Sequence, residues 1–358
     1  GTALGGDNGI AVAMVLAILE SDDIPHPPIE AVFTTDEETG MDGAIGLDCS
    51  KLKGRILLNA DSEEEGVLTV GCAGGARVSA RFDLVKQQGV GTAYLVEVGG
   101  LCGGHSGVEI DKGRYNANIL MGRFLNTLGS VTLQEIAGGS KDNAITRTCR
   151  ALIMTQADVP SAADAFVKDN HNANDPDFTI TVTRTAPFEG YCADGLIRFL
   201  ATVPNGVTAM SADIEGLVET SLNLGVLAMD GESVICHFSV RSGINAKRDA
   251  LCDTLIEQAC ACGGRAEKGG HYPAWEYRKQ SPLRDTMVKV YEEMYHATPQ
   301  VLTIHAGLEC GLFCQKMPDL DAVSFGPNMR DIHTSRERLS ISSTARTYEY
   351  ICRILKEL

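Results

Sequence analysis

Residues 29–40 read IEAVFTTDEETG, a short apolar run that opens into an acidic loop. The run 29–33 predicts a β-strand, because it is apolar, only a few residues long and bounded by polar and turn-forming residues. An apolar helix is predicted before it, over 8–20, and a second strand after it, over 55–59. Strands that alternate with helices predict an α/β domain, with a mostly parallel sheet and helices on both faces.

The pattern changes in the middle of the chain and then returns. From about residue 75 the predicted strands show polar alternation and are joined by hairpins as well as helices, which is typical of an α+β domain. After about residue 270, helices and short apolar strands alternate again. We therefore expect one domain built from 1–74 and 270–358, with a second, α+β domain inserted over 75–269.

The composition of the chain limits the kinds of molecule that it is expected to bind. The chain has 358 residues and a formal net charge of -16. Such an acidic balance argues against nucleic acid and anionic membranes, because either would need clustered Lys or Arg. The 12 cysteines are scattered without a Cys-x-x-Cys pair, which predicts reduced thiols and a cytoplasmic protein. The longest apolar stretch, 10–19, is too short to span a bilayer.

Three acidic clusters follow predicted strands or begin a predicted helix. Asp7 lies at a glycine-rich turn, Glu37 and Glu38 follow the 29–33 strand, and Asp61 follows the 55–59 strand. In open α/β sheets, ligands collect at the carboxyl ends of the strands. Carboxylates brought together there repel one another unless a cation neutralises them, which predicts a pair of divalent metal ions. Taken alone, an acidic pair after a strand is more often a helix N-cap.

Two histidines are candidates for the same site. His333 lies in a polar loop after the predicted strand 322–325, and imidazole is a favoured ligand of zinc. His105 is flanked by glycines that let a ligand approach the backbone closely. For either one taken alone, an ordinary hydrogen-bonded surface histidine is the competing interpretation.

Adjacent Glu37 and Glu38 suggest that one carboxylate binds metal while its neighbour stays free as a general base. The base would take a proton from a water that the metal has acidified, and the water oxygen would attack an amide carbon. The oxyanion that forms needs a donor, which a histidine can supply.

The ordered set of motifs resembles the M20 metallopeptidases, and within them the aminoacyl-histidine dipeptidases, also called Xaa-His dipeptidases or peptidase D. The similarity spans essentially the whole chain. The motifs are, in chain order, Gly5-Gly6-Asp7-Asn8-Gly9, Thr34-Thr35-Asp36-Glu37-Glu38-Thr39-Gly40-Met41, Asn59-Ala60-Asp61-Ser62-Glu63-Glu64-Glu65-Gly66, Gly103-Gly104-His105-Ser106-Gly107, Asn143-Ala144-Ile145, His305-Ala306-Gly307-Leu308-Glu309-Cys310-Gly311 and Gly326-Pro327 up to His333.

The resemblance implies a zinc-exopeptidase-like catalytic domain and a lid and dimerisation domain. It also implies a metal centre, in which Asp7 bridges two ions, Glu38 and His333 hold one, and Asp61 holds the other. Zinc is the first expectation for the metal, with manganese or cobalt as alternatives. Glu37 would be the general base.

Further roles follow for residues outside the metal centre. His105 would stabilise the oxyanion, in dimeric relatives from the partner subunit's lid, so a homodimer through the lid domain is expected. Arg241 would hold the substrate carboxylate with its bidentate fork. For Arg241, a surface ion pair at a strand end is the competing interpretation. Glu309 would line the substrate site and contact a free amino terminus.

Two departures from the family pattern stand out. The family has a His-x-Asp pair ahead of the bridging aspartate, and no such pair precedes Asp7 here, so we expect that an N-terminal segment is missing. Loss of the support that such a pair gives often costs about 10–100-fold in metal affinity or activity. Thr146 stands where relatives commonly have proline.

The implied reaction is metal-dependent hydrolysis of dipeptides, of the Xaa-His type or broader. Two alternatives stay open. One is an aminoacylase or tripeptidase of the same family. The other is a non-catalytic fragment or a metal-binding dimerisation module.

Overall fold

A computed structural model describes residues 2–358 and divides the chain into two compact units. The first unit contains the chain up to Ala73 together with Pro273–Leu358, and the second is Gly74–Tyr272. None of the helices among residues 2–358 has the length and apolar character that a membrane span requires. All twelve cysteines are free thiols.

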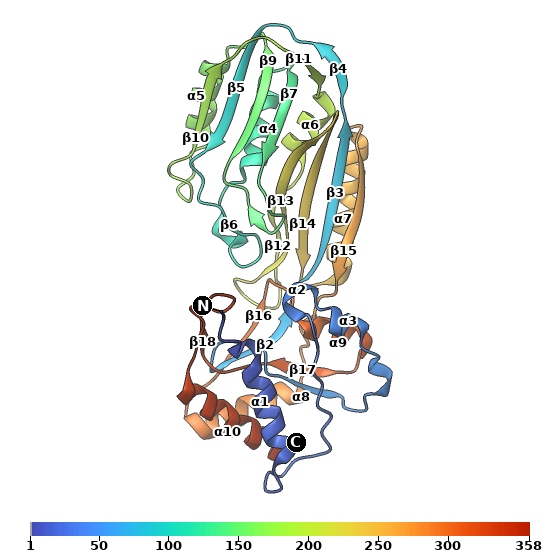
Figure 1. The fold of residues 1–358 in the computed structure, drawn as a ribbon, viewed down its shortest axis with the longest axis vertical. Helices are drawn as coiled ribbons and strands as arrows, with labels where there is room; N and C mark the ends of the chain where they lie inside the picture. The colour runs from blue at the N-terminus through green and yellow to red at the C-terminus, as the bar shows by residue number, and fades with distance from the viewer. Residues whose placement is uncertain (1) are drawn as a thin grey trace. The chain divides into compact units, whose positions relative to one another are not determined.

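The first unit contains a four-stranded sheet in the order β1 (Ile56–Asn59), β17 (Asp321–Ser324), β2 (Val67–Cys72) and β16 (Gln300–Ile304) (Figure 1). The β1/β17 and β16/β2 pairs are parallel, and only Ser324 and Thr69 form an antiparallel pair, between β17 and β2. The sheet is therefore mostly parallel, as predicted.

Helices cover both faces of this sheet. Successive strand residues point to opposite faces, so Val323 and Ala322 of β17 mark the two sides. Val323 packs in a core with residues of α1 (Gly6–Glu20), α8 (Pro282–Tyr295) and α10 (Ile341–Glu357). Ala322 packs instead with Cys310 of α9 (Glu309–Lys316). This arrangement confirms the α/β class.

The strand predicted over 29–33 is not formed. The chain there is extended, but the structure assigns no strand between α1 and β1. A strand needs a neighbour to satisfy its backbone groups, and of the described residues only β17 pairs with β1. Phe33 is consequently 50% exposed. The helix predicted over 8–20 is present as α1, although it leaves Val12, Leu16 and Leu19 partly exposed.

The second unit is built on an antiparallel sheet of eleven strands. Eight of them form one continuous path, in the order β10 (Thr179–Arg184), β5 (Thr92–Gly99), β9 (Cys149–Thr155), β7 (Thr132–Gly138), β13 (Val218–Asp230), β14 (Ser233–Ser242), β3 (Gly74–Asp83) and β15 (Arg265–Tyr272). Three more strands pair off this path, namely β4 (Val85–Gln88), β11 (Glu189–Cys192) and β12 (Gly206–Met210).

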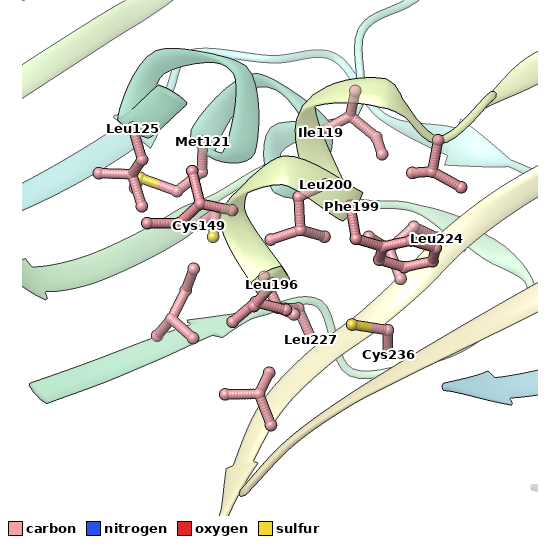
Figure 2. Packing of buried hydrophobic residues seen from close by; sticks show 14 of the residues in the cluster. Ile119, Met121, Leu125, Cys149, Leu196, Phe199, Leu200, Leu224, Leu227 and Cys236 are labelled. Atoms are coloured by element: carbon pink, nitrogen blue, oxygen red, sulfur yellow. The ribbon is translucent and has the colours of Figure 1, made fainter. Parts of the chain in front are cut away.

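Four helices accompany this sheet: α4 (Ala117–Thr127), α5 (Val159–Asp169), α6 (Asp194–Thr202) and α7 (Asn245–Ala261). Figure 2 shows Phe199 and Leu200 of α6 lying among Met121 of α4 and Leu224 of β13. All four side chains are almost fully buried. Burial of each such side chain favours folding by about 1.5–3 kcal/mol. This core therefore stabilises the unit from which its loops extend.

Candidate metal centre

Three of the predicted ligands converge in the first unit. The Nε2 atom of His333 lies 3.0 Å from Oδ2 of Asp7 and 2.8 Å from Oε2 of Glu38. One ligand atom from each residue falls within 4.8 Å of the others. Two carboxylates and one imidazole around a common point are the donors that zinc and similar divalent ions take.

Each of these side chains is presented by an irregular piece of backbone. Asp7 lies in the first turn of α1, after Gly5 in the left-handed region at φ 76°. Glu38 lies in α2 (Glu37–Gly40), a single turn that follows Asp36 at φ 58°. His333 lies in the loop between β18 (Met329–Arg330) and β19 (Arg338–Leu339).

His333 itself has a left-handed backbone, with φ 59°, and so does Asp331, with φ 53°. Such a conformation is uncommon for residues other than glycine. It costs about 1–3 kcal/mol and persists only where the surrounding structure holds it. The β18/β19 hairpin supplies a frame, because Arg338 donates to Oδ2 of Asp331 at 2.7 Å. The strained backbone aims the imidazole at the two carboxylates.

Asp61 lies next to these ligands but outside the group of three. It follows β1, and its Oδ1 accepts a hydrogen bond of 2.6 Å from Nδ2 of Asn8. The same amide donates to the carbonyl of Ala60 at 2.9 Å. Burial, followed by the charge of Asp7, raises the pKa of Asp61.

Negative charge also surrounds the predicted base, Glu37. Burial raises the pKa of Glu37 to about 7, and Asp61, Glu38, Glu309 and Asp7 add to that shift. Glu309 is itself buried. Its Oε2 accepts from the Thr34 hydroxyl at 2.9 Å, while its Oε1 finds no donor among residues 2–358. This concentration of carboxylates favours a cation.

Two acidic residues of this region were not singled out from the sequence. Desolvation and the charges of Asp7 and Asp61 raise the pKa of Glu63, so its carboxylate lies within electrostatic range of these two residues. Its place after β1, in the Ser62-Glu63-Glu64-Glu65 run, was the available signal. The carboxylate of Glu337 accepts backbone hydrogen bonds from Gly5 and Asp7. Nothing in the sequence marks that contact, since more than 300 residues separate the partners.

His105 lies in the second unit, on β6 (Gly104–His105), which pairs with β8 (Ala144–Ile145). Its Nδ1 accepts hydrogen bonds from the backbone N–H groups of Gly107, at 3.1 Å, and Val108, at 3.2 Å. A nitrogen that accepts carries no proton, so the ring is neutral with its hydrogen on Nε2. Burial and the charge of Arg241 lower the pKa of His105, which also favours the neutral ring.

Thr146, where we expected proline from the family resemblance, makes hydrogen bonds near the end of β8. Its hydroxyl lies within hydrogen-bonding distance of the carbonyls of Leu224, at 3.2 Å, and Gly225, at 3.0 Å, and it accepts from Nδ2 of Asn118 at 3.2 Å. Thr146 is 3% exposed. The Thr146 hydroxyl therefore has a structural role in the segment that follows β8.

Arg241 is a buried residue of β14 in the second unit. One of its terminal nitrogens donates to the hydroxyl of Tyr272 at 2.8 Å. Its Nε is buried and finds no acceptor among residues 2–358. A surface ion pair, the competing interpretation from the sequence, is therefore not what the structure shows. A buried guanidinium with a free donor suits a carboxylate ligand.

Comparison with known proteins then places the chain. Residues 1–357 match the family described as peptidase family M20/M25/M40. The chain belongs to this family. It is 36% identical over 375 residues to the cytosol non-specific dipeptidase of Escherichia coli (strain K12), a match that covers 100% of this chain and 77% of that protein.

Two solved structures are similar to the chain. The aminoacylhistidine dipeptidase from Vibrio alginolyticus superposes with a TM-score of 0.94 at 36% identity, over 100% of this chain and 76% of that one. The aminopeptidase PepT from Bacillus cereus ATCC 10987 shares the fold, with a TM-score of 0.51 at 16% identity over 99% of this chain and 72% of that one. The resemblance predicted from the ordered motifs is confirmed.

Proposed function

We propose that this M20 peptidase hydrolyses dipeptides, with divalent metal held by Asp7, Glu38 and His333. The convergence of these three ligand atoms within 4.8 Å carries the proposal. The two relatives at 36% identity are named as dipeptidases, one non-specific and one for aminoacyl-histidine, which supports a dipeptide of the Xaa-His type or broader.

The residues present fit a divalent ion. The donor set is two carboxylates and one imidazole, and the Nε2 of His333 lies within 3.0 Å of an oxygen of each carboxylate. Zinc is our first choice, with manganese or cobalt as alternatives, because all three take such ligands. A second ion would be held by Asp7 and Asp61, with Asp7 as the bridge.

When bound, such ions supply Lewis acidity and lower the pKa of water at the site. Glu37 is then the group that takes a proton from the attacking water. As the oxygen of the water bonds to the amide carbon, the C–N bond breaks and the same carboxyl returns the proton to the leaving amine. Glu37 suits this task because it adjoins the ligand Glu38 and has no metal-binding role of its own in our assignment.

We assign three further roles in substrate binding and turnover. His105 donates its Nε2 hydrogen to the developing oxyanion, since its Nδ1 is already occupied as an acceptor. Arg241 binds the substrate carboxylate through its free donor. Glu309, with Oε1 free, binds the amino terminus. Groups that recognise both ends of the substrate would restrict the enzyme to dipeptides.

We also propose that the protein works in the cytoplasm as a homodimer joined through the second unit, which would act as the lid. The cytosolic name of the Escherichia coli relative supports the location. The dimer rests on the family resemblance alone.

The test is release of free amino acids from a panel of Xaa-His and other dipeptides, after chelation and after re-addition of zinc or manganese. Acetylated amino acids and tripeptides serve as the matched alternatives. We expect metal-dependent turnover of unblocked dipeptides and none of acetylated substrates. Preferred turnover of acetylated amino acids or tripeptides would replace the dipeptidase assignment. Metal binding of fewer than one ion per chain, with no turnover, would favour a non-catalytic module.

A further inference from the structure

The carboxylate of Glu337 holds the turn that carries Asp7. Its Oε1 accepts the backbone N–H of Asp7 at 2.9 Å, and its Oε2 accepts the backbone N–H of Gly5 at 3.0 Å. Each oxygen therefore takes one amide, so the carboxylate fixes the orientation of the turn as well as its distance. The first N–H groups of a helix have no partner within the helix, and Gly5 has no side chain to supply one.

Glu337 belongs to the same loop as His333, four residues further along the chain. That loop is braced internally, because the Thr334 hydroxyl donates to the carbonyl of Asp331 at 2.6 Å and the N–H of Glu337 donates to the carbonyl of Thr334 at 3.2 Å. At its end the loop is closed by the pairing of β18 with β19. The position of the Glu337 carboxylate is thereby tied to that of the His333 ring.

The carboxylate consequently joins two backbone segments that each supply a ligand. Asp7 and His333 are 326 positions apart in the sequence, yet their ligand atoms lie 3.0 Å apart. The Glu337 carboxylate adds a second polar link between the segments that carry them. Groups that orient metal ligands from outside the coordination sphere typically change metal affinity by about 10–100-fold when removed.

We propose that Glu337 is a positioning residue for the metal centre, holding the Asp7 turn and the His333 loop at the spacing that a shared ion needs. The inference rests on the metal centre proposed above. It predicts that loss of the Glu337 carboxylate lowers metal affinity in addition to any effect on folding stability.

The chain offers a matched control in the same unit. The Oε2 of Glu30 also accepts two backbone N–H groups, from Lys53 at 2.8 Å and Gly54 at 2.7 Å, and it joins segments that carry none of the three clustered ligands. Replacing Glu30 therefore removes a clamp of the same kind without touching either the Asp7 turn or the His333 loop.

The experiment compares Glu337→Ala, Glu337→Gln and Glu30→Ala in the full chain. Zinc and manganese dissociation constants are measured by competition with a chromogenic chelator, and thermal unfolding is followed in the metal-free protein. We expect Glu337→Ala to raise the metal Kd by about 10–100-fold and Glu30→Ala to leave it within about twofold. Both alanine variants should lower the metal-free Tm by similar amounts. The metal Kd of Glu337→Gln, which keeps one acceptor oxygen, should fall between those of the parent and Glu337→Ala. This variant replaces Glu337→Ala in the comparison if the alanine variant does not fold.

Equal metal Kd values for Glu337→Ala and the parent, or an equal rise in Glu30→Ala, would overturn the positioning role. A parent protein that binds neither metal would instead overturn the proposed metal centre itself.

Discussion

The side-chain amide of Asn8 donates to Oδ1 of Asp61 at 2.6 Å, so the residue next to Asp7 is tied to the carboxylate assigned to the second ion. This bond connects the start of α1 to the end of β1. It gives the Asp61 carboxylate a fixed direction at the end of β1.

Replacing Asn8 with alanine should therefore weaken binding of the second ion more than the first. We expect about a tenfold loss of affinity for the second equivalent, as for other groups that orient a ligand. Calorimetric titration of the metal-free protein resolves the two equivalents. Asn59→Ala is the control, because Asn59 ends the same strand but donates to the Ser324 hydroxyl at 3.0 Å. An equal effect in both variants would count against the assignment.

Replacing Glu37 with glutamine should leave metal binding intact and remove most turnover. The amide is nearly isosteric but cannot take a proton, so we expect kcat to fall by about 10²- to 10⁴-fold. Metal content is measured alongside kcat on the dipeptide that the parent prefers. Glu64→Gln, at an exposed neighbour of Glu63, should retain parental activity. A Glu37→Gln enzyme as active as the parent would rule out the general-base role.

The ring of His105 should be neutral, with its proton on Nε2. Nitrogen NMR of the imidazole should show an unprotonated Nδ1 and a protonated Nε2 near neutral pH, because two backbone N–H groups point at Nδ1. His105→Ala should lower kcat by about 10²- to 10³-fold, as loss of an oxyanion donor does. His237→Ala is the control in the same unit, since the His237 ring contacts the Ser79 hydroxyl. Normal turnover by the His105→Ala variant would contradict the proposed oxyanion role.

The loop that carries His105 should depend on Glu109 in a pH-sensitive way. The hydrogen bond from Lys112, followed by the one from the backbone N–H of His105, lowers the pKa of Glu109 to about 2. Because the pKa is lowered in the folded state, the ionised carboxylate stabilises the fold above its ordinary value of 4.5, and that stabilisation is lost as the pH falls toward 2.

Urea unfolding of the parent and of Glu109→Gln checks this. The gap between the two unfolding free energies should be full near neutral pH and should shrink as the solution is acidified below about pH 4.5. A gap that is the same at every pH would mean that the charge of Glu109 plays no part.

The sequence was informative for this chain because the proposed metal ligands lie at the ends of predicted strands or at the start of a predicted helix. Asp7 opens a helix, Glu38 follows an apolar run, and His333 follows a strand, so each was visible without knowing its neighbours. The M20 family and the α/β class are confirmed by the comparisons and the fold. The strand predicted over 29–33 failed because pairing, and not the pattern of one segment, decides whether a strand forms.

Contacts between segments that are distant in the sequence could not be predicted, because they also depend on the neighbours that a segment finds in the folded chain. The bond from Asp7 to Glu337 and the amides that occupy Nδ1 of His105 depend on backbone positions that only the folded chain defines. Neither Glu337 nor Gly107 belongs to a residue type or spacing that by itself indicates such a role. Hydrogen bonds of this kind set the direction of a functional group, whereas sequence patterns mainly reveal its identity.

The left-handed backbone at His333 means that the residue type best for folding stability differs from the one needed for the proposed metal site. Glycine adopts that conformation freely, and a protein selected for stability alone would favour glycine there. Only histidine supplies the imidazole. Stabilising substitutions gathered without regard to activity should therefore accumulate in this loop, and their gain in thermal resistance should come with loss of the metal ligand that we propose at His333. Attempts to make the enzyme more heat-resistant should leave residues 331–333 untouched and seek improvement elsewhere.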